Sequence, residues 1–283
     1  MTFSIAAHDG DAWGVAVASK FVAVGSIVPA VRVGVGAVAT QSLARWAYRN
    51  ELLDALASGT DVQTALAAAA AADDGRALRQ VGAVGGTGAA TFTGDECFAW
   101  AGGRAAGDTE TAYAVQGNIL TGPEVVEAME AAFLAHAGAA LDERLLAALL
   151  AGDAAGGDSR GRQSAALLVH APGAGYDACG VLADLRVDDH PHAPTELARL
   201  HALATLVFGG PEEVTPLGGA LRAEVARHLA ALGHAPEDQG PAVERALEAW
   251  MSAVNLENRH SPGGIDGRVL EELRSAARDL TDC

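Results

Sequence analysis

The first twenty residues of the chain, MTFSIAAHDGDAWGVAVASK (residues 1–20), decide how the fold begins. Apolar residues alternate along residues 2–8 with the period of two that is typical of a half-buried strand. An Asp-Gly-Asp turn follows, and the apolar run after it has the same strand character. The sequence therefore predicts an antiparallel hairpin of residues 2–8 and 13–19, which brings Lys20 close to Thr2.

Strand and helix patterns follow one another in groups along the next part of the chain. Helical patterns cover residues 50–58, 61–72, 122–138, 141–152 and 194–208. Strand patterns cover residues 33–41, 78–84, 89–94, 97–102, 112–118, 164–170 and 179–189. Groups of strands separated by groups of helices favour an α+β fold, in which helices cover antiparallel sheets, over a repeated βαβ unit.

The character of the sequence changes at a Gly-Gly-Pro break, residues 209–211. The residues beyond it carry no strand signal and hold three helical patterns, at residues 218–232, 240–254 and 267–280. We therefore expect two domains, a main domain of residues 1–208 and a small helical domain of residues 209–283.

Composition and charge narrow the classes of function. The 283 residues carry a formal net charge of −17, and such a field repels nucleic acids and anionic membrane surfaces. The cysteines, Cys97, Cys179 and Cys283, are scattered without a CxxC pair, which is typical of a reducing compartment. The sequence has no signal-peptide pattern and no uncharged apolar run long enough to span a membrane. We expect a cytoplasmic protein that binds neither nucleic acid nor membrane.

Thr2 is the first candidate for chemistry, because Met is normally removed when a small residue follows it. An N-terminal Thr would combine a hydroxyl nucleophile with an amine base whose ordinary pKa is about 8. The charge of Lys20 would lower the pKa of that amine, and a register slip of one residue would bring Ser19 to the same place. The structural alternative stays open: Thr is a good strand former, and Lys20 is then an exposed strand end.

Polar residues at other strand ends and in one loop are further candidates. Gln41 and Asn118 each end a predicted strand, and their side-chain amides are donors suited to an oxyanion. The loop GGDSRGRQS, residues 156–164, contains Asp158, Arg160 and Arg162. Two arginines beside backbone amides can hold a carboxylate, although a Gly-rich loop without a phosphate-loop spacing is usually only a turn.

A divalent metal is a weaker alternative. Asp188, Asp189, His190 and His192 offer oxygen and imidazole ligands within one short run. Ligands adjacent in sequence rarely complete a coordination sphere without partners elsewhere, and solvated residues between a strand and a helix would show the same pattern. We therefore expect no metal and no other cofactor.

With these residues in hand, the chain resembles domain-of-unknown-function family 1028. The resemblance covers roughly residues 2–205 and is carried, in order, by TFSIAAHD, GVAVASK, VGVGAVATQ, RQVGAV, WAG, QGNILTGPEVVEAM, GGDSRGRQSAALLV and DLRVDDHP. It implies an Ntn-hydrolase-like fold, a four-layer αββα sandwich with an N-terminal nucleophile. The N-terminal Thr of the family corresponds to Thr2, its basic position on the second strand to Lys20, and its loop to Asp158 and Arg160. The tail resembles a domain named for peptidoglycan binding.

These observations lead to one favoured hypothesis and its rivals. The favoured hypothesis is an N-terminal-threonine hydrolase that cleaves an amide bond of a small molecule or a peptide-like substrate. The rivals are a non-catalytic binding or scaffolding protein on a hydrolase fold and a metal-assisted hydrolase at Asp188, Asp189 and His190. For partners we expect such a substrate, a glycan at the helical domain and further copies of the chain in a homo-oligomer.

Overall fold

The computed structural model of the protein describes residues 2–237 and 240–280. The chain divides into two compact units, Met1–His201 and Ala202–Cys283. The first unit is a mixed unit of helices and antiparallel sheets. The division falls inside helix α5, Ala193–Phe208, whereas the sequence analysis placed a boundary near residue 209.

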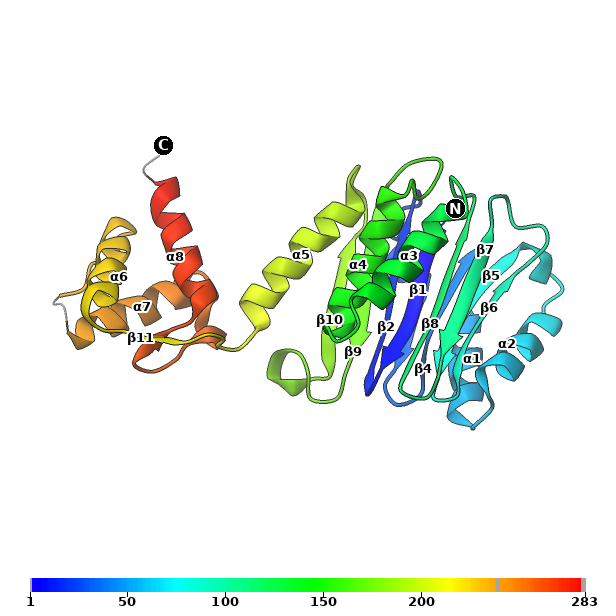
Figure 1. Cartoon of the computed structure of the whole chain (residues 1–283), viewed down its shortest axis with the longest axis horizontal. Coiled ribbons are helices and arrows are strands. Elements are labelled where there is room, and N and C mark those ends of the chain that lie inside the picture. Colours follow the sequence, from blue (N-terminus) through cyan, green and yellow to red (C-terminus); the bar gives the residue numbers. More distant parts are fainter. Residues whose placement is uncertain (1, 238–239, 281–283) are drawn as a thin grey trace. The chain divides into compact units, whose positions relative to one another are not determined.

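The opening hairpin lies at the centre of a six-stranded antiparallel sheet in the first unit (Figure 1). Its strand order is β10 (Val181–Val187), β9 (Ser164–His170), β2 (Ala12–Ser19), β1 (Thr2–Asp9), β8 (Thr111–Asn118) and β7 (Gly102–Gly107). Phe3 pairs with Ala18 and Asp9 pairs with Ala12, so the predicted hairpin is confirmed.

A second sheet has four antiparallel strands. It is ordered β3 (Pro29–Arg32), β4 (Gly36–Ser42), β5 (Arg79–Gly85) and β6 (Gly88–Thr93). Val15 and Val17 of β2 share an apolar cluster with Ala37 and Ala39 of β4, so the two sheets pack face to face.

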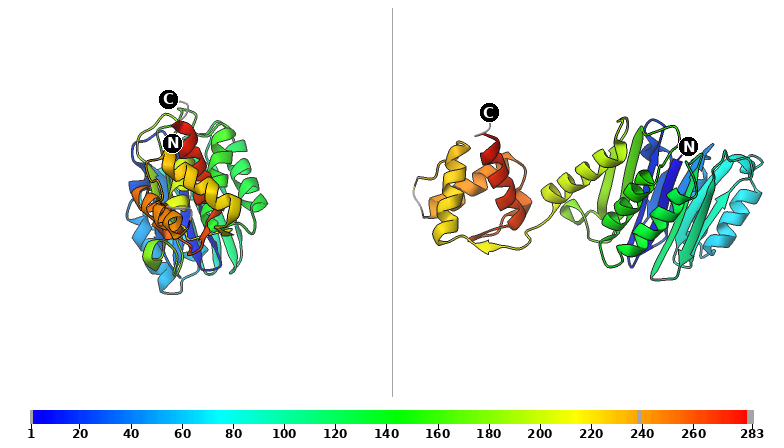
Figure 2. Two further views of the ribbon diagram at one scale, coloured as in Figure 1. Left: turned by 90° about the vertical axis from the view of Figure 1, so that its left-hand side faces the viewer. Right: turned by 45° about the horizontal axis from the view of Figure 1, so that its top comes forward.

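Helices cover the other face of each sheet, and Figure 2 shows the two helix pairs on opposite sides of the strands. Helices α3 (Glu124–Ala135) and α4 (Leu141–Ala154) pack on the six-stranded sheet, and α1 (Tyr48–Ala57) and α2 (Val62–Ala71) pack on the four-stranded sheet. All five helices of residues 48–208 lie where helical patterns predicted them. Short 3-10 turns lie at Val24–Ser26, Arg76–Leu78, Tyr176–Ala178 and Glu257–Arg259.

The alternation along β1 determines which side chains lie between the sheets. Phe3 and Ile5 point into the cluster with α3 and α4, whereas Ala6 points into the cluster between the sheets. Successive side chains of a strand point to opposite faces, so Thr2 and Ser4 share the inter-sheet face with Ala6. This parity places the candidate nucleophile in the space between the two sheets.

Two strand predictions in the first unit were wrong. The strand expected at residues 97–102 lies instead at Gly102–Gly107, and Pro29–Arg32 was not expected to be a strand. Both β7 and β3 are edge strands, and β7 is mostly exposed. An edge strand needs little apolar alternation and tolerates Pro, so its sequence carries a weak signal.

The second unit contains α6 (Gly219–Ala231), α7 (Pro241–Ala253) and α8 (Gly267–Asp279), close to the three helical patterns. Its own apolar cluster includes Leu229, Leu273 and Trp250. The expectation of no strand there was wrong: β11 (Thr215–Pro216) and β12 (Gly264–Ile265) form a two-residue antiparallel pair. Two residues are too few to show an alternation in sequence.

Candidate functional site

Thr2 begins β1 and is held from three neighbouring strands. Its Oγ lies 3.1 Å from Oγ of Ser19 on β2, and either hydroxyl can be the donor. Its backbone carbonyl accepts hydrogen bonds from Nε2 of Gln41 at 3.2 Å and from Nδ2 of Asn118 at 3.4 Å. Thr2 is only 6% exposed, so its side chain is largely shielded from solvent.

A chain of buried polar side chains continues from Thr2 across the two sheets. Nε2 of Gln116 donates to Oγ of Ser4 at 2.7 Å, and Oγ of Ser4 donates to Oε1 of Gln41 at 2.7 Å. Nε2 of Gln41 and Nδ2 of Asn118 both donate to Oε1 of Gln80, each at 2.9 Å. We call these five residues, Ser4, Gln41, Gln80, Gln116 and Asn118, the amide circuit.

The backbone fixes the direction of every donor in the amide circuit. Nε2 of Gln80 lies 2.7 Å from the carbonyl of Gly117 and 3.2 Å from that of Gly102. Carbonyls only accept, so this end of Gln80 must be the NH₂ group, and its oxygen must face Gln41 and Asn118. The circuit starts and ends on β8, crosses both sheets and contains no ionisable group.

A cavity of about 510 Å³ opens beside Thr2. Its walls come from both sheets and from the loops at their ends. They are Thr2, Phe21, Val24, Ile27, Val28, Gln41, Ser42, Leu43, Ala44, Arg79, Phe98, Asn118, Ile119 and Arg160. The cavity is thus mainly apolar, with Thr2, Ser42, two amides and two arginines as its polar side chains, which is the usual make-up of a small-molecule site.

Large apolar side chains at the cavity are partly exposed. Phe21, Leu43 and Phe98 are 51%, 54% and 62% exposed, and we call these three residues the apolar rim. Ser164 fixes the loop that carries Phe21, because its hydroxyl donates to the Phe21 carbonyl and accepts from the backbone N–H of Val24. Such exposed apolar groups at a cavity mark a place where another molecule can bind.

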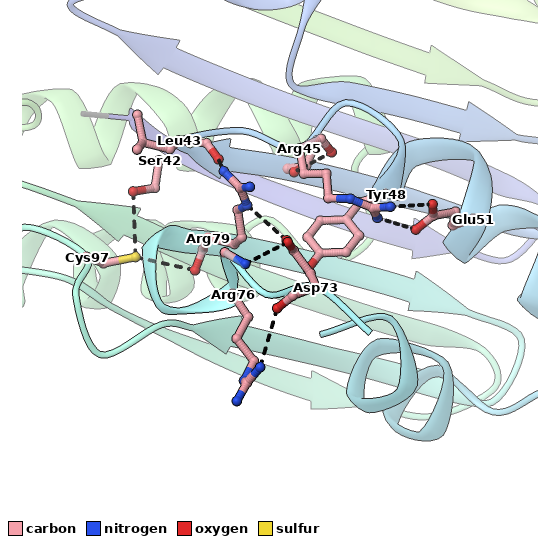
Figure 3. A network of polar contacts seen from close by, with 11 residues as sticks. Ser42, Leu43, Arg45, Tyr48, Glu51, Asp73, Arg76, Arg79 and Cys97 are labelled. Carbon is pink, nitrogen blue, oxygen red and sulfur yellow. Dashed lines mark hydrogen bonds and ion pairs between the residues drawn. The ribbon is translucent and has the colours of Figure 1, made fainter. Parts of the chain in front are cut away.

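Arg79 enters the cavity wall from the start of β5 and is firmly held (Figure 3). Its Nε donates to Oδ2 of Asp73 at 2.9 Å, and its Nη1 donates to the carbonyl of Leu43 at 2.5 Å. Asp73 also accepts from the Tyr48 hydroxyl at 2.9 Å. The hydrogen bond from Arg79 is the largest cause that lowers the pKa of Asp73 to about 2, so Asp73 stays ionised at neutral pH.

The loop of residues 157–163 reaches the same cavity through Arg160. Buried Asp158 accepts from the backbone N–H of Lys20 at 2.7 Å and from that of Arg160 at 2.9 Å, which fixes both loops. The Lys20 side chain is exposed, and its Nζ donates to the carbonyl of Arg162 at 3.2 Å, outside the cavity lining. Arg162 also lies outside that lining and pairs with Asp153 at 2.6 Å.

The residues considered for a metal have other contacts. Oδ1 of Asp189 accepts from Gln163 at 3.1 Å, and Nδ1 of His190 accepts from the backbone N–H of His192 at 3.1 Å. The backbone carbonyl of Asp188 accepts from Ala23. Within residues 2–237 and 240–280, no group of three or more His, Cys, Asp or Glu side chains is arranged to hold a metal ion.

Sequence reasoning did not select several residues of this site. Gln80 is a buried polar residue on the side of its strand that faces the other sheet, and the alternation of the strand was the available signal for it. Arg79 and the apolar rim lie in segments whose position relative to Thr2 depends on tertiary structure, so nothing local in the sequence identified them.

The first unit is therefore a mixed α/β domain whose mainly apolar cavity lies beside the first strand, β1. The chain belongs to the family described as "Family of unknown function (DUF1028)", whose sequence model matches residues 2–197. Residues 205–273 match a second family model, described as "Putative peptidoglycan binding domain". The resemblance inferred from sequence is confirmed for both segments.

A crystal structure of a protein from Silicibacter pomeroyi, assigned to the same family, is similar to this chain. The two chains share 31% identity with a TM-score of 0.63, and the match covers 80% of this chain and 94% of the other. A search among curated proteins found no match. In the part of the chain that the structure describes, no helix is both long and apolar enough to cross a membrane.

Proposed function

We propose that the first unit is an N-terminal-threonine amide hydrolase with the four-layer αββα arrangement of Ntn hydrolases. The observation that carries the proposal is the placement of Thr2, whose hydroxyl is hydrogen-bonded to Ser19 and which lines a mainly apolar cavity. Met1 lies outside the described residues, and the proposal requires its removal.

The reaction would proceed in two steps. Thr2 Oγ attacks the substrate carbonyl while the free Thr2 amine takes the hydroxyl proton, directly or through one water. That proton passes to the nitrogen of the substrate, which leaves as an amine, and an acyl ester remains on Thr2. Water then hydrolyses the ester, releases the carboxylic acid and regenerates the hydroxyl.

The amides beside Thr2 support this chemistry. Asn118 lines the cavity, and its contact with the Thr2 carbonyl is long at 3.4 Å. A developing oxyanion can replace so weak a contact, and we propose Asn118 as its donor. Gln41 also lines the cavity, but its Nε2 has three acceptors, Oε1 of Gln80 at 2.9 Å, the Thr2 carbonyl at 3.2 Å and the Gln116 carbonyl at 3.3 Å, so we give it the role of holding the Thr2 carbonyl. The Lys20 Nζ donates to the Arg162 carbonyl outside the cavity lining, so we give Lys20 only a long-range electrostatic effect on the Thr2 amine.

The proposal is tested first by the mass of the intact purified protein. We expect a mass lower than that of the full sequence by one methionine residue. A retained Met1 would leave Thr2 without a free amine, and it would favour the rival hypothesis of a binding protein without catalysis.

The second test is turnover of a panel of small amides, N-acyl amino acids and cyclic amides by wild type and variants. Thr2→Ala should reduce kcat for any cleaved amide by about 10³-fold or more, because it removes the attacking oxygen. Thr2→Ser keeps both the hydroxyl and the small second residue, and it should retain measurable activity. Equal turnover by wild type and Thr2→Ala would reject the nucleophile, and activity lost to a chelator would favour the metal-assisted alternative.

We also propose that the second unit binds a glycan, on the strength of its match to the peptidoglycan-binding family model. Trp250 is only 3% exposed, so it is not available to stack on a sugar ring. A groove of about 680 Å³ on α8, with Arg268, Arg274 and Ser275 in its wall, is the better candidate surface. Sedimentation with purified peptidoglycan tests this role, and gel filtration tests the expected homo-oligomer.

A further inference from the structure

We propose that Arg79 holds a carboxylate of the substrate and that the apolar rim receives an apolar group of the same molecule. The substrate class is thus an amide that also carries a free carboxylate and an aromatic or aliphatic group, as in an N-acyl amino acid with an apolar side chain. This inference rests on the proposed function, since it names the substrate of the same cavity.

The contacts of Arg79 leave one part of its guanidinium available. Nε and Nη1 are used by Asp73 and by the Leu43 carbonyl. Nη2 lies beside Gly75, which does not line the cavity, whereas Nη1 bonds to Leu43, which does line it, and Nη1 carries a second N–H. Because the guanidinium is planar, the bonds of Nε and Nη1 also fix the direction of that second Nη1 hydrogen, in a side chain that is only 21% exposed.

Asp73 makes this arrangement independent of a ligand. It is 9% exposed and accepts from the Tyr48 hydroxyl and from the backbone N–H of Gly75, both at 2.9 Å, in addition to Arg79. Figure 3 shows Asp73 between Tyr48 and Arg79. Arg79 is therefore held in position before any substrate binds, which reduces the entropy cost of holding an anion.

Arg160 is less suited to the same role. Its side chain is 47% exposed, and its Nη2 lies 3.3 Å from Oδ2 of Asp158. A half-exposed guanidinium is well solvated and gives a weaker and less directional contact with an anion. We therefore assign the first contact with the carboxylate to Arg79.

The apolar rim indicates that the substrate also carries an apolar group, in addition to the carboxylate. Phe21 and Phe98 come from different loops and both line the cavity that contains Arg79 and Thr2. An apolar group that covers them removes exposed aromatic surface from water, which favours binding. A small molecule that carries both a carboxylate and an apolar group therefore matches Arg79 and the apolar rim in the cavity wall.

The test measures binding, with hydrolysis blocked by Thr2→Ala. The probes are N-acetylphenylalanine and N-acetylphenylalanine amide, which differ only in the carboxylate, and the measurement is isothermal titration calorimetry. We expect the acid to bind about tenfold more tightly than the amide, because a charge-assisted hydrogen bond is lost in the amide. In Thr2→Ala/Arg79→Gln this preference should disappear while the affinity for the neutral amide changes less than twofold.

Further variants test whether the preference for the acid depends on the charge of Arg79, on the position of its side chain or on correct folding of the protein. Arg104→Gln removes an arginine that pairs with Glu127 and Glu130 outside the cavity lining, and it should leave the preference unchanged. Asp73→Asn keeps Arg79 but loosens it, and it should reduce the preference severalfold. If Arg79→Gln does not fold, Arg79→Lys serves instead and should keep part of the preference.

Equal binding of the two probes to the Thr2→Ala protein would overturn the inference, and this comparison needs no change at Arg79. A preference that survives Arg79→Gln would also overturn it. The outcome for the proposed function is separate, because a carboxylate preference without any turnover by wild type would reject the hydrolase and leave the carboxylate site in place.

Discussion

At the scale of single residues, Gly82 on β5 shows how closely the two sheets approach at the polar end. A Cβ placed on Gly82 would lie 1.9 Å from Oε1 of Gln116, far inside van der Waals contact. The side chain of Gln116 therefore crosses directly over the backbone of β5. A glycine in a strand often marks such a close approach, and here it leaves room for the amide circuit.

We predict that Gly82→Ala destabilises the protein by about 1–3 kcal/mol, because Gln116 must leave its position and its hydrogen bond to Ser4. Gly86→Ala is the matched control, since nothing lies within 4 Å of a Cβ at Gly86 and its φ is not in the left-handed region. Urea denaturation measures both changes. Equal stability of the two variants would contradict the described position of Gln116.

At the scale of elements, Asp73 connects three segments of the first unit. It follows α2, accepts from Tyr48 at the start of α1, and pairs with Arg79 at the start of β5. The sequence showed Asp73 only as the end of a helical pattern. Its connecting role depends on how α1, α2 and β5 meet, which no local pattern contains.

This connection predicts a pH dependence of stability. The pKa of Asp73 is lowered from 3.8 to about 2, so its contribution is fully present above pH 3.8 and is lost as the pH falls through about 2. At pH 7 we expect Asp73→Asn to be less stable than wild type by about 1–2 kcal/mol, and the difference should shrink between pH 4 and pH 2. Denaturation at several pH values measures this. A difference that does not change with pH would contradict the ion pair.

The sequence predicts the helices and central strands of this protein better than it predicts the residues of the candidate site. Central strands and helices were predicted because burial imposes alternation on the residues of β1 and the 3.6-residue period on those of α3. Edge strands such as β7 were misplaced because they bury little. At the site, Thr2, Gln41, Asn118 and Arg160 were selected from local patterns and line one cavity. Arg79 was not selected, because its position there is set by the pairing of β5 with β4.

At the scale of the whole molecule, each unit has apolar clusters of its own. Leu229 and Leu273 lie in the cluster of the second unit, and Leu149 and Phe133 lie in a cluster of the first. A chain built in this way is expected to depart from two-state unfolding.

We therefore predict that calorimetry resolves two unfolding transitions. Leu229 is fully buried in α6, and Leu229→Ala should lower the free energy of unfolding of the second unit by about 2–5 kcal/mol. Only the transition temperature of that unit should therefore fall. Leu149→Ala, at a fully buried position of α4, is the reciprocal control and should lower only the other transition. One transition that shifts in both variants would mean that the units unfold together.

The amide circuit has a consequence for spectroscopy. Its side-chain NH₂ groups are buried and bonded in one direction, from Gln116 through Ser4 and Gln41 to Gln80. Their protons exchange with solvent only when the two sheets separate locally, so they should persist in deuterium oxide for as long as the central backbone amides do. Such protons would give nuclear magnetic resonance signals outside the crowded region of solvated glutamines. Because Gln41 and Asn118 also line the cavity, a bound molecule would move these signals, and binding can be followed without a label on the ligand.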